Sequence, residues 1–189
     1  MVRPCALFAS DFMLTSASGV FPGRGRAIWR DWYTHEVVNA TTGGLTTLDA
    51  PLGHINVHIR DGSAILLHAK PAYTIEQTRQ GPYELLVSQD AHGNAFVDAY
   101  IDDGVTAQPT PSRVVKFHAR EGALVISSTG TFNVKQLLET VTILGTAKPA
   151  RVIVGGHTVQ SWQYFAAEEK LVVSELHINL DHTTTVSWR

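Results

Sequence analysis

The chain has 189 residues, of which 44% are apolar and 17% charged, and its formal net charge is −2. This length fits one large domain or two small ones, and it is too short for a complete (β/α)8 barrel of roughly 250 residues. The charge balance offers no footprint for nucleic acid, and no aliphatic run is long enough to span a membrane. The single cysteine, Cys5, excludes an intrachain disulfide and a thiolate metal cage.

Residues 1–19 are predicted to form a poorly ordered leader. A secretory signal is the alternative, with Arg3 as its charged start and the small residues 15–19 as its cleavage region. Asp11 interrupts the apolar region that such a signal needs, which favours the leader.

The rest of the chain has the composition of a β-protein. Val, Ile and Thr together supply 48 residues, and these β-branched types favour strands. Residues 28–38 have a strand composition, residues 55–59 alternate apolar and polar side chains, and residues 64–67 indicate a buried strand. Lys70-Pro71 indicates a junction, because proline cannot donate to a β-ladder.

Further short strands follow this junction. They are expected at residues 85–87, 96–101, 114–118, 124–127, 137–144, 152–154, 171–173 and 185–188. Glu121-Gly122 and Gly155-Gly156 are turn signals between them, and only residues 166–170 have a helix-like composition. Short strands at regular spacing predict an all-β fold, a sandwich or a barrel.

Two polar clusters could carry chemistry, but spacing argues against both. Neighbouring side chains on a strand point to opposite faces, so Asp102 and Asp103 are predicted to form an Asp-Gly turn rather than an acid/base pair, with a turn-bound cation as the minor alternative. His54 and His58 would lie about 13 Å apart along a strand, too far to share one metal ion. No metal site and no cofactor is therefore predicted.

Three aromatic residues form the candidate binding site. Trp29, Trp32 and Tyr33 could stack on sugar rings, with Trp29 and Tyr33 on one strand face and Trp32 on the other. The competing interpretation is that they are aromatic anchors of the core. Asn39-Ala40-Thr41 is a formal N-glycosylation acceptor at Asn39, which matters only in a secreted chain.

An ordered series of motifs resembles family 31 of the glycoside hydrolases. The stretches at residues 28–34 and 50–60 are similar to that family's "WYDWYTG" and "APLDHIPVHIRGG", and residues 85–104 are similar to its "LLVALD…LFWDDGES". Residues 141–145 and 186–188 resemble the C-terminus of the eukaryotic acid α-glucosidases and maltases within it. The order and spacing agree from about Val20 to the last residue.

This resemblance implies an antiparallel β-sandwich architecture and a non-catalytic role. Residues 20–71 would be a truncated proximal C-terminal sandwich, and residues 72–189 a complete distal one. The family's barrel, which carries its two catalytic aspartates for retaining hydrolysis of terminal α-glucosidic bonds, has no counterpart here. No catalytic residue is carried over. The implied partner is that barrel in cis, and the parent family is secreted, vacuolar or lysosomal.

A free-standing carbohydrate-binding sandwich, with α-glucan or maltose as its ligand, is the alternative function. A relic without a function of its own is a third. Three departures from the family pattern also stand out: Asp61 replaces the usual Gly or Ala, His68 stands near the usual Pro-Leu-Gln stretch, and residues 1–18 resemble nothing expected upstream of Val20. Because truncation would expose strand edges, residues 20–70 are expected to be less stable than the distal sandwich.

Overall fold

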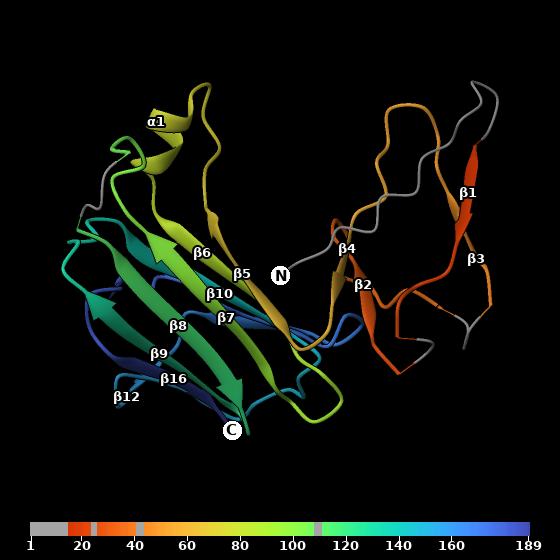
Figure 1. The fold of residues 1–189 in the computed structure, drawn as a ribbon. Coiled ribbons are helices and arrows are strands. Elements are labelled where there is room, and N and C mark those ends of the chain that lie inside the picture. The colour runs from red at the N-terminus through yellow and green to blue at the C-terminus, as the bar shows by residue number, and fades with distance from the viewer. Residues whose placement is uncertain (1–14, 24–25, 41–43, 108–110) are drawn as a thin grey trace.

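The computed structural model describes residues 15–189, apart from residues 24–25, 41–43 and 108–110. The described residues form sixteen strands and one short helix (Figure 1), so the predicted all-β class is confirmed. Four strands precede the main body: β1 (Ser16–Gly19), β2 (Trp29–Asp31), β3 (Thr46–Asp49) and β4 (His58–Arg60). They pair antiparallel as two small sheets, β1 with β3 and β2 with β4.

Twelve strands make one large, mostly antiparallel sheet. Its members are β5 (Ser63–His68), β6 (Tyr83–Ser88), β7 (Ala95–Ile101), β8 (Arg113–Arg120), β9 (Ala123–Gly130), β10 (Leu137–Leu144), β11 (Val152–Val154), β12 (His157–Val159), β13 (Trp162–Phe165), β14 (Lys170–Val173), β15 (Ile178–Asn179) and β16 (Thr184–Trp188).

The sheet folds over into two facing layers. One layer runs β12-β11-β16-β9-β8-β7 and the other β5-β6-β10-β14-β13, with β15 beside β10. A single parallel bridge between Ser63 and Phe96 joins them, and β6 with β10 is the other parallel pair among the described strands. This arrangement is the predicted sandwich, nearly closed into a barrel.

The main core lies between the two layers. Along β8, side chains alternate between buried and exposed, so Val115 and Phe117 point inward while Lys116 and His118 face outward. Phe117 is fully buried and belongs to the same apolar cluster as Ile126 of β9 and Ile143 of β10. Burial of these large side chains from both layers provides the main driving force for folding.

A second, smaller core lies on the outer face of the β6 layer. Leu86 of β6 and Leu144 of β10 pack there against Ile59 of β4, with Trp32 alongside. The β2–β4 sheet therefore covers this face. Because β6 is buried on both sides, its apolar run is continuous rather than alternating.

Three expectations from the sequence need correction. Residues 16–19 are strand β1, so they are not part of a poorly ordered leader; residues 1–14 lie outside the described residues. The helix is α1 (Ile75–Arg79), begun by Thr74, whose side chain accepts a hydrogen bond from the backbone N–H of Gln77. Residues 166–169, which have a helix-like composition, form a turn instead.

The third correction concerns β5. It lies in the segment assigned to the truncated first sandwich, residues 20–71, yet it pairs along its whole length with β6 of the second, from Ser63 opposite Ser88 to His68 opposite Tyr83. One edge of β5 is therefore covered by β6, while its other edge pairs with β7 through Ser63 alone. The division into two sandwiches at residues 71 and 72 stays a prediction.

Candidate functional site

The chain turns sharply at the three aromatic candidates instead of continuing as a strand. β2 ends at Asp31, whose carboxylate oxygen Oδ1 accepts hydrogen bonds from the backbone N–H groups of Tyr33 and Thr34, both at 2.8 Å. An aspartate that caps the backbone two residues on is a turn former. Trp29, Trp32 and Tyr33 therefore do not alternate on one strand.

The turn separates the three rings into different environments. Trp29 is only 4% exposed, its Nε1 donates to the carbonyl of Pro22 at 2.9 Å, and its ring packs on Phe21. A ring buried in this way is an aromatic anchor, here of the β2–β4 region. Trp32 is half-buried against the cluster of Ile59. The structure thus brings these two rings into the core and leaves neither as an open platform.

Tyr33 is the exposed member, with 55% of its surface accessible. Its hydroxyl donates to the carbonyl of Ile55 at 3.1 Å, and its ring lies 5.2 Å from that of His54, tilted by 49°. These contacts tie residues 33 and 54–55 into one surface feature. Sugar stacking at Tyr33 stays a prediction.

Exposed apolar side chains are frequent in the sequence segment that contains this feature. Among the described residues, six of the thirteen large exposed hydrophobic side chains lie within residues 20–55: Val20, Tyr33, Val37, Leu45, Leu52 and Ile55. We call these six the N-terminal apolar surface. Leu52 is 94% exposed and Leu45 is 70% exposed. Exposed apolar patches mark interaction surfaces, so these six side chains are candidates for contact with another part of a protein.

The β1–β3 ribbon points to the same conclusion. It has only two strands, and in Figure 1 it projects away from the large sheet. A two-stranded ribbon is marginally stable alone, and the outer edge of each of its strands presents unpaired backbone groups. Further structure packed against the ribbon would stabilise it and would pair these backbone groups.

A buried arginine attaches the N-terminal segment to the sandwich. Arg30 of β2 is 1% exposed, and its Nη1 donates to the carbonyls of His35 at 3.2 Å and Glu168 at 3.0 Å. Its Nη2 lies 3.4 Å from the carboxylate of Glu169. His35 and Glu169 both adopt left-handed backbone conformations, with φ of 65° and 49°. Such conformations are uncommon outside glycine and persist where the surroundings fix them.

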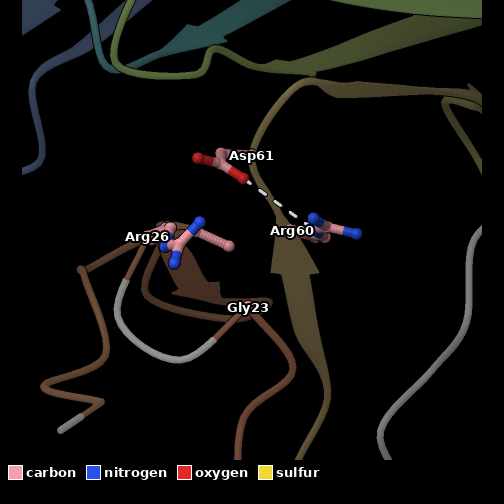
Figure 2. Close-up of a pocket in the computed structure, with 5 residues that line it drawn as sticks. Gly23, Arg26, Arg60 and Asp61 are labelled. Atoms are coloured by element: carbon pink, nitrogen blue, oxygen red, sulfur yellow. Dashed lines mark ion pairs between the residues drawn. The ribbon is translucent and has the colours of Figure 1, made fainter. Parts of the chain in front are cut away.

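A shallow open pocket of about 410 Å³ lies beside β4, lined by Gly23, Arg26, Ala27, Arg60 and Asp61. Figure 2 shows the carboxylate of Asp61 directed toward Arg60, whose Nε is 3.9 Å away. The other oxygen of Asp61 accepts from the backbone N–H of Ile28 at 2.9 Å, and its own N–H donates to the carbonyl of Ile28. Asp61, the departure from the family pattern, therefore secures the end of the β2–β4 sheet.

The remaining candidates occupy structural roles. Asp102 and Asp103 each accept backbone hydrogen bonds within a turn, as predicted, and the bonds from the hydroxyl and N–H of Thr106 help to lower the pKa of Asp103. His58 is buried against Phe21, whereas His54 is exposed beside Tyr33.

No chemistry-bearing cluster emerges in the described part of the chain. It contains no group of three His, Cys, Asp or Glu side chains placed to hold a metal ion. It also contains no helix with the length and hydropathy of a bilayer span. Asn39 is exposed, while Thr41 of the same glycosylation triplet lies outside the described residues. The fold and these residues define a β-sandwich protein with an N-terminal segment suited to contact with other structure.

Comparisons with known proteins agree with this class. No protein-family model matches the chain. It is 40% identical over 159 residues to an α-glucosidase of Schizosaccharomyces pombe (84% of this chain, 16% of that protein), and 38% identical over 177 residues to an α-glucosidase of Aspergillus oryzae (92% and 18%). A solved structure of a glucosidase II α subunit superposes with a TM-score of 0.79 at 21% identity, covering 96% of this chain and 22% of that one.

The chain belongs to family 31 of the glycoside hydrolases, as a homologue of part of its α-glucosidases. It spans less than a fifth of the length of these relatives. An alignment with an α-glucosidase of Candida tsukubaensis covers 93% of the chain, more than residues 20–189 alone contain. The similarity to the family therefore extends upstream of Val20, where none was expected.

Proposed function

We propose that this chain is the non-catalytic C-terminal β-sandwich region of an α-glucosidase-type enzyme, and that it braces the catalytic barrel of that enzyme in cis. The N-terminal apolar surface is the observation that carries the proposal. Burial of a side chain such as that of Leu52 or Ile55 stabilises an interface by about 1.5–3 kcal/mol. The chain spans less than a fifth of the length of its relatives, and in an enzyme of their length the catalytic barrel would cover this surface.

The Arg30 contacts support the same role. Arg30 joins β2 to the turn at Glu168 and Glu169. It therefore connects the segment that carries the N-terminal apolar surface to the large sandwich. The sandwich core, with Phe117 and Ile143 fully buried, is the rigid support. The parent reaction would be retaining hydrolysis of terminal α-glucosidic bonds, performed by residues outside this chain.

A chimera tests the proposal. The homologous region of the Schizosaccharomyces pombe α-glucosidase is replaced by this chain, and secreted activity and thermal stability are measured. We expect the chimera to be active and the variant Leu52→Glu/Ile55→Glu to lower its yield and melting temperature. Ile75→Glu is the matched control, because Ile75 is 74% exposed on α1, outside this surface.

Two results would contradict the proposal. One is hydrolysis of a chromogenic α-glucoside by the purified 189-residue chain alone. The other is a Leu52→Glu/Ile55→Glu chimera as stable as the Ile75→Glu control, which would show that this surface contacts nothing in the assembled enzyme.

A further inference from the structure

The outer face of the β7–β8 layer carries a second group of exposed aromatic side chains. Along β7 the burial pattern alternates, so Phe96, Asp98 and Tyr100 all point outward. Phe96 is 68% exposed and Tyr100 is 64% exposed. Four residues along a strand correspond to about 13 Å, so the two rings flank a stretch longer than one sugar ring.

Polar side chains fill the space between and beside these rings. The register of β7 with β8 places Asp98 opposite Lys116 and Phe96 opposite His118. The Nζ of Lys116 lies 3.7 Å from a carboxylate oxygen of Asp98, and the ring of His118 meets that of Phe96 edge-on at 6.3 Å. Phe96, Asp98, Lys116 and His118 line an open hollow of about 400 Å³ together with Arg120. Tyr100 lies further along β7, beside this hollow.

The charges indicate which ligand suits this hollow. Lys116 is paired with Asp98, and Arg120 lies 3.2 Å from the carboxylate of Glu121, so each charged side chain that lines the hollow has a partner of opposite charge. These groups still offer hydrogen-bonding capacity to hydroxyl groups. The ring of Phe96 in this hollow, the ring of Tyr100 beside it and the paired, hydrogen-bonding side chains suit a neutral ligand whose surface alternates apolar faces and hydroxyl groups, which describes an oligosaccharide.

The position of the hollow leaves it accessible. The β2–β4 sheet packs on the outer face of the opposite layer, through Ile59 and Leu86. In Figure 1 β1 and β3 lie at the far right, well apart from β7 and β8. A surface that binds ligand here would remain free while the N-terminal apolar surface is covered.

We propose that Phe96, Asp98, Tyr100, Lys116 and His118 form a binding site for a neutral α-glucan chain on the outer face of β7 and β8. The choice of an α-glucan rests on the proposed function, since the parent enzyme would act on α-glucosidic bonds. The site would hold a polymeric substrate near that enzyme and would perform no chemistry itself.

The test uses the 189-residue chain and its variants in native gels containing soluble starch, with titration by maltoheptaose in a calorimeter. We expect the unaltered chain to be retarded by starch. Phe96→Ala or Tyr100→Ala should each weaken maltoheptaose binding about tenfold, the effect of removing one well-packed aromatic contact. Phe96→Tyr should retain binding, because it keeps the ring. These positions are exposed, so the variants are expected to fold.

Two further variants localise the binding. Tyr73→Ala, which removes a fully exposed aromatic side chain elsewhere, and Tyr33→Ala should both bind as the unaltered chain does. Absence of retardation in the unaltered chain would overturn the site. So would unchanged binding in the Phe96→Ala/Tyr100→Ala double variant, or loss of binding in Tyr33→Ala. Failure of starch binding with an active chimera overturns this site alone, whereas an inactive chimera with intact starch binding overturns the bracing role alone.

Discussion

Arg30 provides the sharpest test of how the N-terminal segment is held. Its guanidinium is buried, whereas the side chain of its ionic partner Glu169 is 62% exposed. Two explanations of how Arg30 stabilises the N-terminal segment can be tested against each other. In one the ion pair with Glu169 dominates, and in the other the two hydrogen bonds to backbone carbonyls dominate.

The structure favours the hydrogen bonds. Arg30→Met keeps the apolar stem but leaves the carbonyls of His35 and Glu168 without their donor, which costs about 2–3 kcal/mol at the lower end of the range for two unsatisfied acceptors. The Nε of Arg30 has no hydrogen-bond partner, so nothing is lost there. Glu169→Gln removes only a solvent-screened charge pair, worth below about 1 kcal/mol.

Hydrogen exchange of the amides in β2 measures this difference. We expect Arg30→Met to lower their protection factors about 30- to 150-fold, and Glu169→Gln to lower them less than about fivefold. Arg60→Met is the control, since Arg60 lies in the same small sheet with a side chain that is 60% exposed. Equal losses of protection in Arg30→Met and Glu169→Gln would refute the reasoning.

Three further predictions follow from local geometry. In the isolated chain, amides of residues 15–60 should exchange faster than those of β5 to β16, because β5 is paired within the large sheet; equal protection in mass-spectrometric exchange would contradict this. Burial lowers the pKa of the His58 and His68 imidazoles below 6.5, so the unfolded chain takes up protons that the folded chain excludes. Their contribution to stability is complete above about pH 6.5 and is lost as the pH falls toward the lowered pKa values. The urea midpoint of unfolding should therefore drop between about pH 7 and pH 5, and it should drop less steeply in His58→Phe. An identical pH profile in that variant would count against the role of His58. Glu121 and Gly122 connect β8 to β9 with φ of 51° and 74°, a turn that favours Asn-Gly; Glu121→Asn should raise the melting temperature by the equivalent of about 0.5–1 kcal/mol, and a lowered value would show that the turn is not strained at Glu121.

Much of the fold is encoded locally. The Gly155-Gly156 signal corresponds to the hairpin of β11 and β12, because glycine adopts the left-handed conformations that such turns require. The Asp-Gly turn at residues 102–104 follows from aspartate accepting nearby backbone N–H groups. The family assignment was also accessible from short motifs alone, since their order along the chain is specific even where each motif is weak.

Local sequence did not predict which of the aromatic candidates would be buried. Trp29 and Tyr33 are both aromatic and lie four residues apart, yet Trp29 is buried and Tyr33 is exposed. The difference arises from the turn capped by Asp31 and from the position of Trp29 in the β2–β4 sheet, where it pairs with Arg60, and the second of these contacts brings together residues distant in sequence.

The sequence by itself determined the β-class and the turns discussed above, because these depend on residue types within a few positions of one another, and it determined the family through the order of motifs along the chain. Only the tertiary structure decided that β5 pairs with β6 across the expected boundary, and that Arg30 is buried against residues 168–169. It also decided that Phe96 and Tyr100 share an open face with Lys116 and His118. Pairing and burial of this kind depend on which distant surfaces exclude water together, and no local pattern records that choice.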